Sequence, residues 1–309
     1  MSRPTIAPPG GRQTTPLLGG QIVAAYGRRY LVETADGLLS CVPRGKRSEH
    51  ACGDRVSVAV TSPGEGVIEA ADPRSTLFIR SSSHRTKLIA ANATQVAMVV
   101  AAEPSFSDEL VSRVLAAAEN GGMRALLVLN KCDLTELARH ASERLQPFVQ
   151  AGYEIIEVSA LQDVSTLRAR LQSEATVLVG QSGMGKSSLI NALFPDARAA
   201  TREISVFLAS GKHTTTHALL YRLDNHQTAA TQEWVIDCPG VQEFGLAHLD
   251  WRELSAGFRE FRPLLQQCRF PDCRHQREPG CAIAAAADRG LIAPRRLELY
   301  RRIQAAESA

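Results

Sequence analysis

The sequence predicts a multidomain protein in which a doubly wound α/β domain lies between a small N-terminal β-barrel and a mostly helical C-terminal region. Three observations support this fold class. Short strand patterns separated by turns fill residues 21–85, apolar runs alternate with amphipathic stretches over residues 88–250, and four metal-ligating side chains cluster within residues 251–309. A chain of 309 residues is long enough for about two domains, or more if some are small.

The segment 21–85 is typical of a small barrel. Strands are expected at 21–26, 30–34, 38–42, 54–60 and 67–69, and Asp36-Gly37 is a hairpin signal because both residues tolerate positive φ. Five short strands favour an OB-fold, with an SH3-like barrel as the alternative. Residues 1–20 are rich in Pro, Gly and Thr, so we expect a disordered tail and not a signal peptide.

The segment 88–250 indicates a parallel sheet covered by helices. Continuous apolar runs at 95–101, 125–129, 155–158 and 176–179 are typical of strands that are buried on both faces. Amphipathic stretches at 108–119 and 135–150 lie between them. This alternation of strand and helix patterns predicts the doubly wound sheet.

A phosphate-binding loop of the form G-x-x-x-x-G-K-[ST] follows the run 176–179 and precedes an expected helix at 188–193. Glycines let backbone N–H groups surround phosphates, and the helix N-terminus adds favourable partial charge. We expect Lys186 to contact the β- and γ-phosphates during catalysis and the Ser187 hydroxyl to bind Mg²⁺. The nucleotide-binding residues of this segment are Gly180, Gln181, Ser182, Gly183, Met184, Gly185, Lys186, Ser187 and Ser188.

A guanine-specificity motif, N-K-x-D, follows the run 125–129 and comprises Asn130, Lys131, Cys132 and Asp133. The Asp133 carboxylate can accept hydrogen bonds from N1–H and N2–H₂ of guanine, a donor pattern that adenine lacks. Asn130 can bond the base edge or a neighbouring loop, and the aliphatic stem of Lys131 can cover the ring. The motif precedes the phosphate loop by about fifty residues, the reverse of the usual GTPase order. The pattern therefore predicts a circularly permuted GTPase domain.

A second base-contacting segment supports guanine binding. Ser159 and Ala160 follow the run 155–158, where a backbone N–H can reach guanine O6. Because the carboxyl ends of parallel strands meet at one sheet edge, both segments are expected at the same site.

The switch segments follow the phosphate loop. Asp237 and Gly240 fit D-x-x-G, so Asp237 is expected to hold Mg²⁺ through water and the Gly240 N–H to sense the γ-phosphate. Thr215 is the favoured Mg²⁺ ligand in the threonine-rich segment 211–216, with a simple polar loop as the alternative. Val241 occupies the position of a water-orienting glutamine, which predicts slow intrinsic hydrolysis. His213 is the candidate substitute, and a solvated loop histidine is the alternative.

The C-terminal segment contains a C-x₄-C-x-H-x₅-C pattern formed by Cys268, Cys273, His275 and Cys281. Three thiolates and an imidazole can bind Zn²⁺ tetrahedrally, and four protein ligands favour a structural role. Iron–sulfur ligation and buried free thiols are the alternatives.

Charge and cysteine usage point to a polyanionic partner and a reducing compartment. Residues 252–302 contain eleven arginines against six acidic residues, while residues 88–251 carry twelve basic and eighteen acidic residues. Basic flanks suit contact with nucleic-acid phosphates, although a solvated surface is the alternative. No run of eighteen apolar residues is present, and the scattered cysteines fit the cytoplasm.

The motif order NKCD, VSA, GQSGMGKSS, GKHTTTH, DCPG and then the Cys/His loop resembles the RsgA (YjeQ or EngC) family of circularly permuted GTPases, over about residues 20–300. The resemblance implies an OB-fold, a permuted GTPase domain, a zinc domain, and the cofactors GTP or GDP, Mg²⁺ and one Zn²⁺. It also implies a cytoplasmic monomer that binds the 30S subunit and its 16S rRNA and hydrolyses GTP late in assembly. A GTP-gated RNA-binding module with incidental hydrolysis is the alternative. A stand-alone nucleotide hydrolase is disfavoured by Val241 and the basic flanks.

Overall fold

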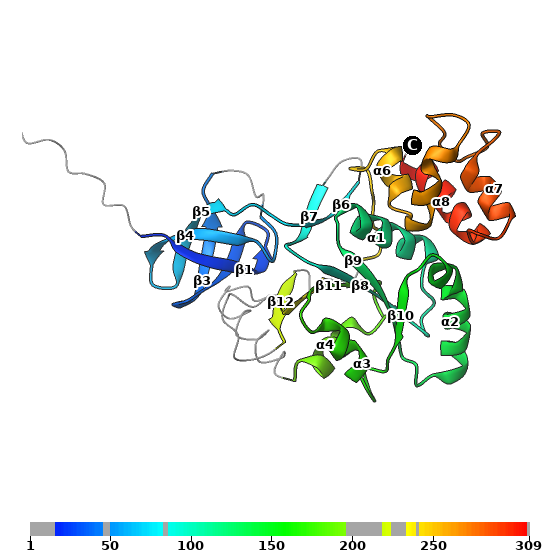
Figure 1. The fold of residues 1–309 in the computed structure, drawn as a ribbon. Helices are drawn as coiled ribbons and strands as arrows, with labels where there is room; N and C mark the ends of the chain where they lie inside the picture. The colour runs from blue at the N-terminus through cyan, green and yellow to red at the C-terminus, as the bar shows by residue number, and fades with distance from the viewer. Residues whose placement is uncertain are drawn as a thin grey trace, which may run out of the picture.

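The computed structural model describes residues 16–45, 50–82, 86–195, 218–223, 233–238 and 241–307. Three parts follow one another along the chain: a barrel of strands, a central sheet with helices, and a helical C-terminal region (Figure 1). Among the described residues, no helix combines the length and apolarity that a membrane crossing requires.

The N-terminal strands close into a five-stranded barrel. The pairing order is β1-β2-β3-β5-β4, and β4 pairs back onto β1. β3 and β5 are parallel, and the other pairs are antiparallel. This closed arrangement confirms the OB-like prediction over the SH3-like alternative. The strands are β1 (Leu18–Tyr26), β2 (Arg29–Thr34), β3 (Gly37–Pro43), β4 (Arg55–Ser62) and β5 (Glu65–Ala71).

β1 begins at Leu18, earlier than the expected boundary between the tail and the barrel at residue 21. Leu18 pairs with Val58 and Gly20 pairs with Val56, so the added residues help to close the barrel. A Cβ atom at Gly20 would lie 2.6 Å from Cγ1 of Val32. Gly20 is therefore tightly packed, and the Gly19-Gly20 pair does not break the strand.

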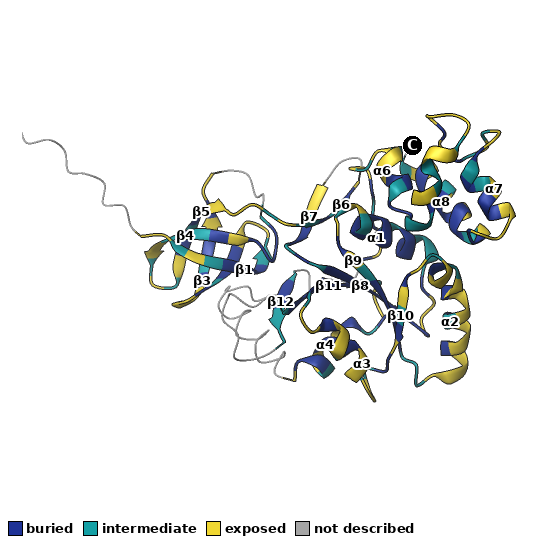
Figure 2. Cartoon of the chain, in the orientation of Figure 1, coloured by how far each residue is buried: buried dark blue, intermediate teal, exposed yellow. Residues whose placement is uncertain are grey.

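The central sheet has the order β10-β9-β8-β11-β13-β12, in which all strands except β12 are parallel. All residues of β8 and β11 are buried, as expected for continuous apolar runs covered on both faces (Figure 2). After β8 the chain continues to β9 on one side of the sheet, whereas after β11 it continues to β12 and β13 on the other side. The helices that follow β8 and β11, α1 and α4, therefore lie on opposite faces of the sheet (Figure 1). The strands are β8 (Gln95–Ala101), β9 (Arg124–Asn130), β10 (Glu154–Glu157), β11 (Ala175–Gly180), β12 (Leu219–Arg222) and β13 (Trp234–Asp237). The helices are α1 (Asp108–Asn120), α2 (Thr135–Gln150), α3 (Ser165–Leu171) and α4 (Lys186–Leu193).

Short strands that the sequence did not predict connect the barrel to the central sheet. β6 (Leu77–Ser81) and β7 (Thr86–Ala91) form a separate antiparallel pair. Ala90 of β7 bridges to Cys52 in the barrel segment. β12 pairs with β1 through Leu219 and Ala24, so the barrel and the central strands form one continuous sheet.

The C-terminal region is helical outside the Cys/His loop, as predicted, and packs against α1 and α2. Its buried Arg296 donates to Glu260 Oε1 at 2.7 Å and to the Ser112 hydroxyl of α1 at 2.9 Å. Its elements are α6 (Trp251–Ala256), the 3₁₀ helix η1 (Arg259–Gln267), α7 (Ala282–Asp288) and α8 (Pro294–Glu307).

Candidate nucleotide and metal sites

Four predicted site segments meet at the carboxyl edge of the central sheet. The N-K-x-D motif begins at the last residue of β9, the Ser159 segment follows β10, the phosphate loop follows β11, and Asp237 ends β13. Ligands bind at this edge in open α/β sheets. The topology thus brings together motifs that are separated along the chain.

Hydrogen bonds fasten the N-K-x-D motif to the phosphate loop. Asn130 Nδ2 donates to the carbonyl of Met184 at 3.0 Å, across 54 positions of sequence. The Lys131 ammonium donates to the carbonyls of Gly183 at 3.0 Å and Glu103 at 2.7 Å. Base-reading and phosphate-binding segments therefore form one unit despite their rotated order.

Gly185 is required by this contact. Its φ is +84°, which is left-handed backbone that favours glycine. A Cβ atom there would lie 2.4 Å from Asn130 Nδ2. A side chain at position 185 would therefore separate the phosphate loop from the base-reading motif.

Hydrogen bonds also join the two predicted base-contacting segments, the N-K-x-D motif and Ser159-Ala160. The Ser159 hydroxyl donates to Asp133 Oδ1 at 2.6 Å, and the Ala160 backbone N–H donates to Asn130 Oδ1 at 3.1 Å. The first bond orients the Asp133 carboxylate, and the second joins the Ala160 backbone to Asn130. The Cys132 thiol donates to the Leu129 carbonyl at 3.2 Å.

Lys186 and Asp237 are neighbouring charged residues beside the phosphate loop. The Lys186 ammonium is buried and donates to the carbonyls of Gly180 at 2.7 Å and Gln181 at 3.0 Å. Burial lowers the pKa of Lys186, while the Asp237 charge acts to raise it. Burial raises the pKa of Asp237 to about 6, while Lys186 acts to lower it.

The residues present fit a Mg²⁺ ion. Within the described part of the chain, Asp237 Oδ1 is buried without a hydrogen-bond partner, and the Ser187 hydroxyl lies on an exposed residue in the first turn of α4. Carboxylate and hydroxyl oxygens are the donors that Mg²⁺ prefers. The predicted residues His213, Thr215 and Gly240 lie outside the described residues.

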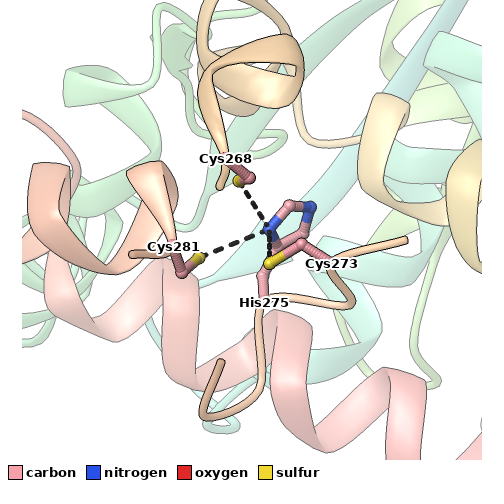
Figure 3. A group of neighbouring side chains, drawn as sticks. All are labelled: Cys268, Cys273, His275 and Cys281. Carbon is pink, nitrogen blue, oxygen red and sulfur yellow. Dashed lines mark hydrogen bonds between the residues drawn. The ribbon is translucent and has the colours of Figure 1, made fainter. Parts of the chain in front are cut away.

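The four predicted metal ligands converge at one point. Their ligand atoms all lie within 4.8 Å of one another, and the sulfur atoms of Cys268, Cys273 and Cys281 lie 3.6, 3.5 and 3.5 Å from His275 Nδ1 (Figure 3). An imidazole nitrogen offers one proton or one lone pair, so it cannot make three ordinary hydrogen bonds. Tetrahedral zinc with Zn–S of about 2.3 Å and Zn–N of about 2.0 Å would place each sulfur about 3.5 Å from the nitrogen. The cluster is therefore compatible with zinc.

Comparison with known proteins identifies similar sequences over most of the chain. A family model described as RsgA GTPase matches residues 71–247. The protein named small ribosomal subunit biogenesis GTPase RsgA from Nitrosospira multiformis is 50% identical over 291 residues, covering 94% of this chain and 91% of that protein. Its namesake from Paraburkholderia xenovorans is 49% identical over 288 residues, covering 91% of each chain. The chain belongs to the RsgA GTPase family.

Solved structures agree with this membership. YjeQ from Thermotoga maritima has a TM-score of 0.72 and 28% identity, covering 95% of this RsgA-family chain and 99% of that protein. YloQ, described as a circularly permuted GTPase, has a TM-score of 0.67 and 23% identity, covering 97% and 98%, and it shows the same fold.

In this RsgA-family chain, the structure places two residues that the motifs did not single out, Leu161 and Ser107, next to predicted site residues. Leu161 directly follows the base-reading Ala160 and is 84% exposed, which is high for an apolar side chain beside a binding site. Gln181 Oε1 accepts from the Ser107 backbone N–H at 2.8 Å and so fixes the phosphate loop to the start of α1. The only feature of the sequence that could have indicated Leu161 is that it is an apolar residue directly after Ala160.

Val241 is part of the core. Its side chain is buried, and its backbone N–H donates to the Gly180 carbonyl at 3.0 Å. It therefore joins the D-x-x-G segment to the phosphate loop and offers no polar side chain to a water molecule.

Proposed function

We propose that this chain is a GTPase that binds the small (30S) ribosomal subunit, acts in its late maturation, and hydrolyses GTP to GDP and phosphate with subunit-stimulated turnover and release. The observation that carries the GTPase part is the Asn130–Met184 hydrogen bond, which joins a guanine-specific motif to a phosphate loop. The names of the similar proteins support the small subunit as partner.

The nucleotide contacts follow from the positions of the side chains. Asp133, oriented by Ser159, accepts from guanine N1–H and N2–H₂, and the Ala160 N–H becomes available to guanine O6 when Asn130 releases it. Leu161 and the stem of Lys131 cover the base. Bound Mg²⁺, held by Ser187, by Thr215 and through water by Asp237, would neutralise phosphate charge. Lys186 turns from the Gly180 and Gln181 carbonyls toward the β- and γ-phosphates.

Hydrolysis needs a water-orienting group other than residue 241, because Val241 is buried and apolar. His213 is the proposed group, being a histidine in the predicted switch segment 211–216. His213→Ala is expected to lower subunit-stimulated turnover by about 10²- to 10⁴-fold, the usual contribution of a general acid–base group, without changing GTP affinity. Unchanged stimulated turnover in a single-turnover assay would exclude His213.

The proposal also assigns the flanking parts. Residues 21–85 and 251–309 are proposed as an OB-fold barrel and a zinc-binding domain that contact 16S rRNA, on either side of the GTPase domain at 88–250. One Zn²⁺ held by the Cys/His cluster would have a structural role, because four protein ligands fill a tetrahedral site. We further propose that the protein acts in the cytoplasm as a monomer.

Sedimentation tests the partner. The full chain is mixed with purified 30S subunits, 50S subunits or free RNA, in the presence of a non-hydrolysable GTP analogue or GDP. The proposal predicts cosedimentation with 30S subunits that is stronger with the analogue than with GDP. Equal binding to all three partners would instead favour the alternative, a GTP-gated RNA-binding module with incidental hydrolysis.

A further inference from the structure

Phe270 is an aromatic residue on the surface of the Cys/His loop. It lies between Cys268 and Cys273, and its side chain is 39% exposed. It is not a member of either hydrophobic core cluster of the described residues. The neighbouring Arg269, Pro271 and Asp272 are also exposed. An exposed aromatic ring of this kind offers a flat apolar face on which a partner group can stack.

The loop presents this ring from a fixed backbone. The Phe270 carbonyl accepts from the Cys273 N–H at 3.3 Å, and the Arg269 N–H donates to the Gly280 carbonyl at 3.1 Å. The Glu278 carboxylate accepts from the N–H groups of residues 274, 276 and 277 at 2.9, 2.8 and 3.0 Å. The backbone that carries the ring is thus fixed by hydrogen bonds before any partner binds, which lowers the entropy cost of binding.

Arginines lie close to two aromatic rings of this region, the exposed Phe270 and the half-buried Trp251. The Arg269 guanidinium carbon lies 5.4 Å from the Phe270 ring centre. Those of Arg252 and Arg274 lie 4.3 and 5.9 Å from the ring centre of Trp251, which is likewise outside the core clusters. We call this set the Phe270 surface, and it comprises Trp251, Arg252, Arg269, Phe270, Arg274 and Arg277.

The cations of the Phe270 surface are available to a partner. None of its four arginines forms a salt bridge with another described residue. By contrast, other arginines of the C-terminal region pair with carboxylates, as Arg262 does with Glu119 and Arg302 with Glu298. The Glu278 carboxylate is already occupied by backbone N–H groups. The Phe270 surface therefore contains four arginines without a carboxylate partner among the described residues, whereas Arg289 and Arg301 of the same region donate to backbone carbonyls.

We propose that the Phe270 surface binds a single-stranded segment of RNA, with an unpaired base stacked on Phe270 and the arginines on adjacent phosphates. Stacking on aromatic faces and charge contact with the backbone are the two means by which proteins bind single-stranded RNA. The excess of cations favours a polyanion over a protein surface. This inference rests on the proposed function, since it specifies how the C-terminal region engages the ribosomal RNA.

The first experiment measures the affinity of full-length variants for purified 30S subunits at fixed salt. Phe270→Ala is expected to weaken binding roughly 5- to 150-fold, the usual effect of removing one stacked base contact. Phe270→Trp, which keeps an aromatic face, is expected to bind within a few-fold of the wild type. Leu291→Ala is the matched control, because Leu291 is a 65% exposed apolar residue of the same region without a ring. Zinc content and thermal melting confirm that each variant is folded.

Two further measurements are the salt dependence of affinity, which separates base stacking from phosphate contact, and cross-linking, which separates RNA contact from protein contact. Phe270→Ala should leave the slope of log affinity against log salt unchanged, whereas Arg269→Ala should reduce it by about 0.7–0.9. Ultraviolet cross-linking of the wild-type complex should join the peptide containing Phe270 to a nucleobase. A cross-link to a ribosomal protein, or wild-type affinity of folded Phe270→Ala, would overturn the inference. Failure of the wild type to bind 30S subunits would instead overturn the proposed function.

Discussion

At the residue scale, Asn130 explains how a rotated order of motifs still produces one nucleotide site. Its amide donates to Met184 in the phosphate loop, and its oxygen accepts from Ala160 in the second base-reading segment. One side chain therefore connects three motifs. Motif spacing predicted that these segments belong to one site, but it could not assign their mutual hydrogen bonds, which depend on the tertiary arrangement.

Asp133 should determine base selectivity. Asp133→Asn replaces a charged acceptor of two guanine hydrogen bonds, so GTP affinity should fall by at least about 3 kcal/mol, or roughly 100-fold. The amide can donate to the O2 of xanthine, so the variant should gain affinity for XTP. Fluorescent-nucleotide titration checks both changes. Unaltered GTP affinity would contradict the assignment of Asp133, and Lys186→Ala, which should lose both nucleotides, is the control.

Asp237 should make Mg²⁺-assisted binding dependent on pH. Because burial raises the pKa of Asp237 to about 6, the carboxylate is charged above that pH and becomes protonated below it. The Mg²⁺-dependent gain in GTP affinity should therefore be complete near pH 7.5 and decline as the pH falls through 6. Asp237→Asn should remove this pH dependence. Titrations with Mg²⁺ and with EDTA across this range measure the gain, and a pH-independent gain in the wild type would refute the role.

At the element scale, the long buried strands and the amphipathic helices were the predictable features. β8 spans the same residues as the expected run at 95–101, and α2 spans the expected 135–150, because their patterns are long and periodic. β6, β7 and β12 were missed. Each contains six residues or fewer. β6 and β7 pair with each other as a separate two-stranded sheet, and β12 pairs with a strand distant in sequence through Leu219 and Ala24. Local pattern carries little information about such strands.

The buried ion pair between α8 and η1 should be essential for stability. Glu260→Ala leaves the Arg296 charge buried without a counter-charge, so the free energy of unfolding should fall by about 3–5 kcal/mol. Adding Arg296→Met should recover much of that loss, since it removes the unpaired charge. Glu143→Ala, at an exposed pair with Arg139, should change stability by less than about 1 kcal/mol. Urea unfolding checks all three variants, and equal effects of Glu260→Ala and Glu143→Ala would contradict the account.

At the scale of the whole molecule, the barrel is connected directly to the nucleotide site. Ala24 of the barrel pairs with Leu219, Leu219 pairs with Asp237, and Asp237 pairs with Leu178 of β11. The barrel has its own core, whereas the central sheet and the C-terminal helices share one. The sequence predicted three regions, but it could not show that the last two are packed as a single body, because Arg296 and its buried partners come from separate helices.

The proposed function requires that the small subunit specifically stimulates this GTPase. We would test it by measuring the GTP turnover rate of the full chain with purified 30S subunits, and comparing it with the rates with 50S subunits, with free RNA and with the chain alone. The account predicts slow turnover alone, because Val241 is buried and apolar, strong stimulation by 30S subunits, and none by 50S subunits. Equal stimulation by 30S subunits, 50S subunits and free RNA would contradict it.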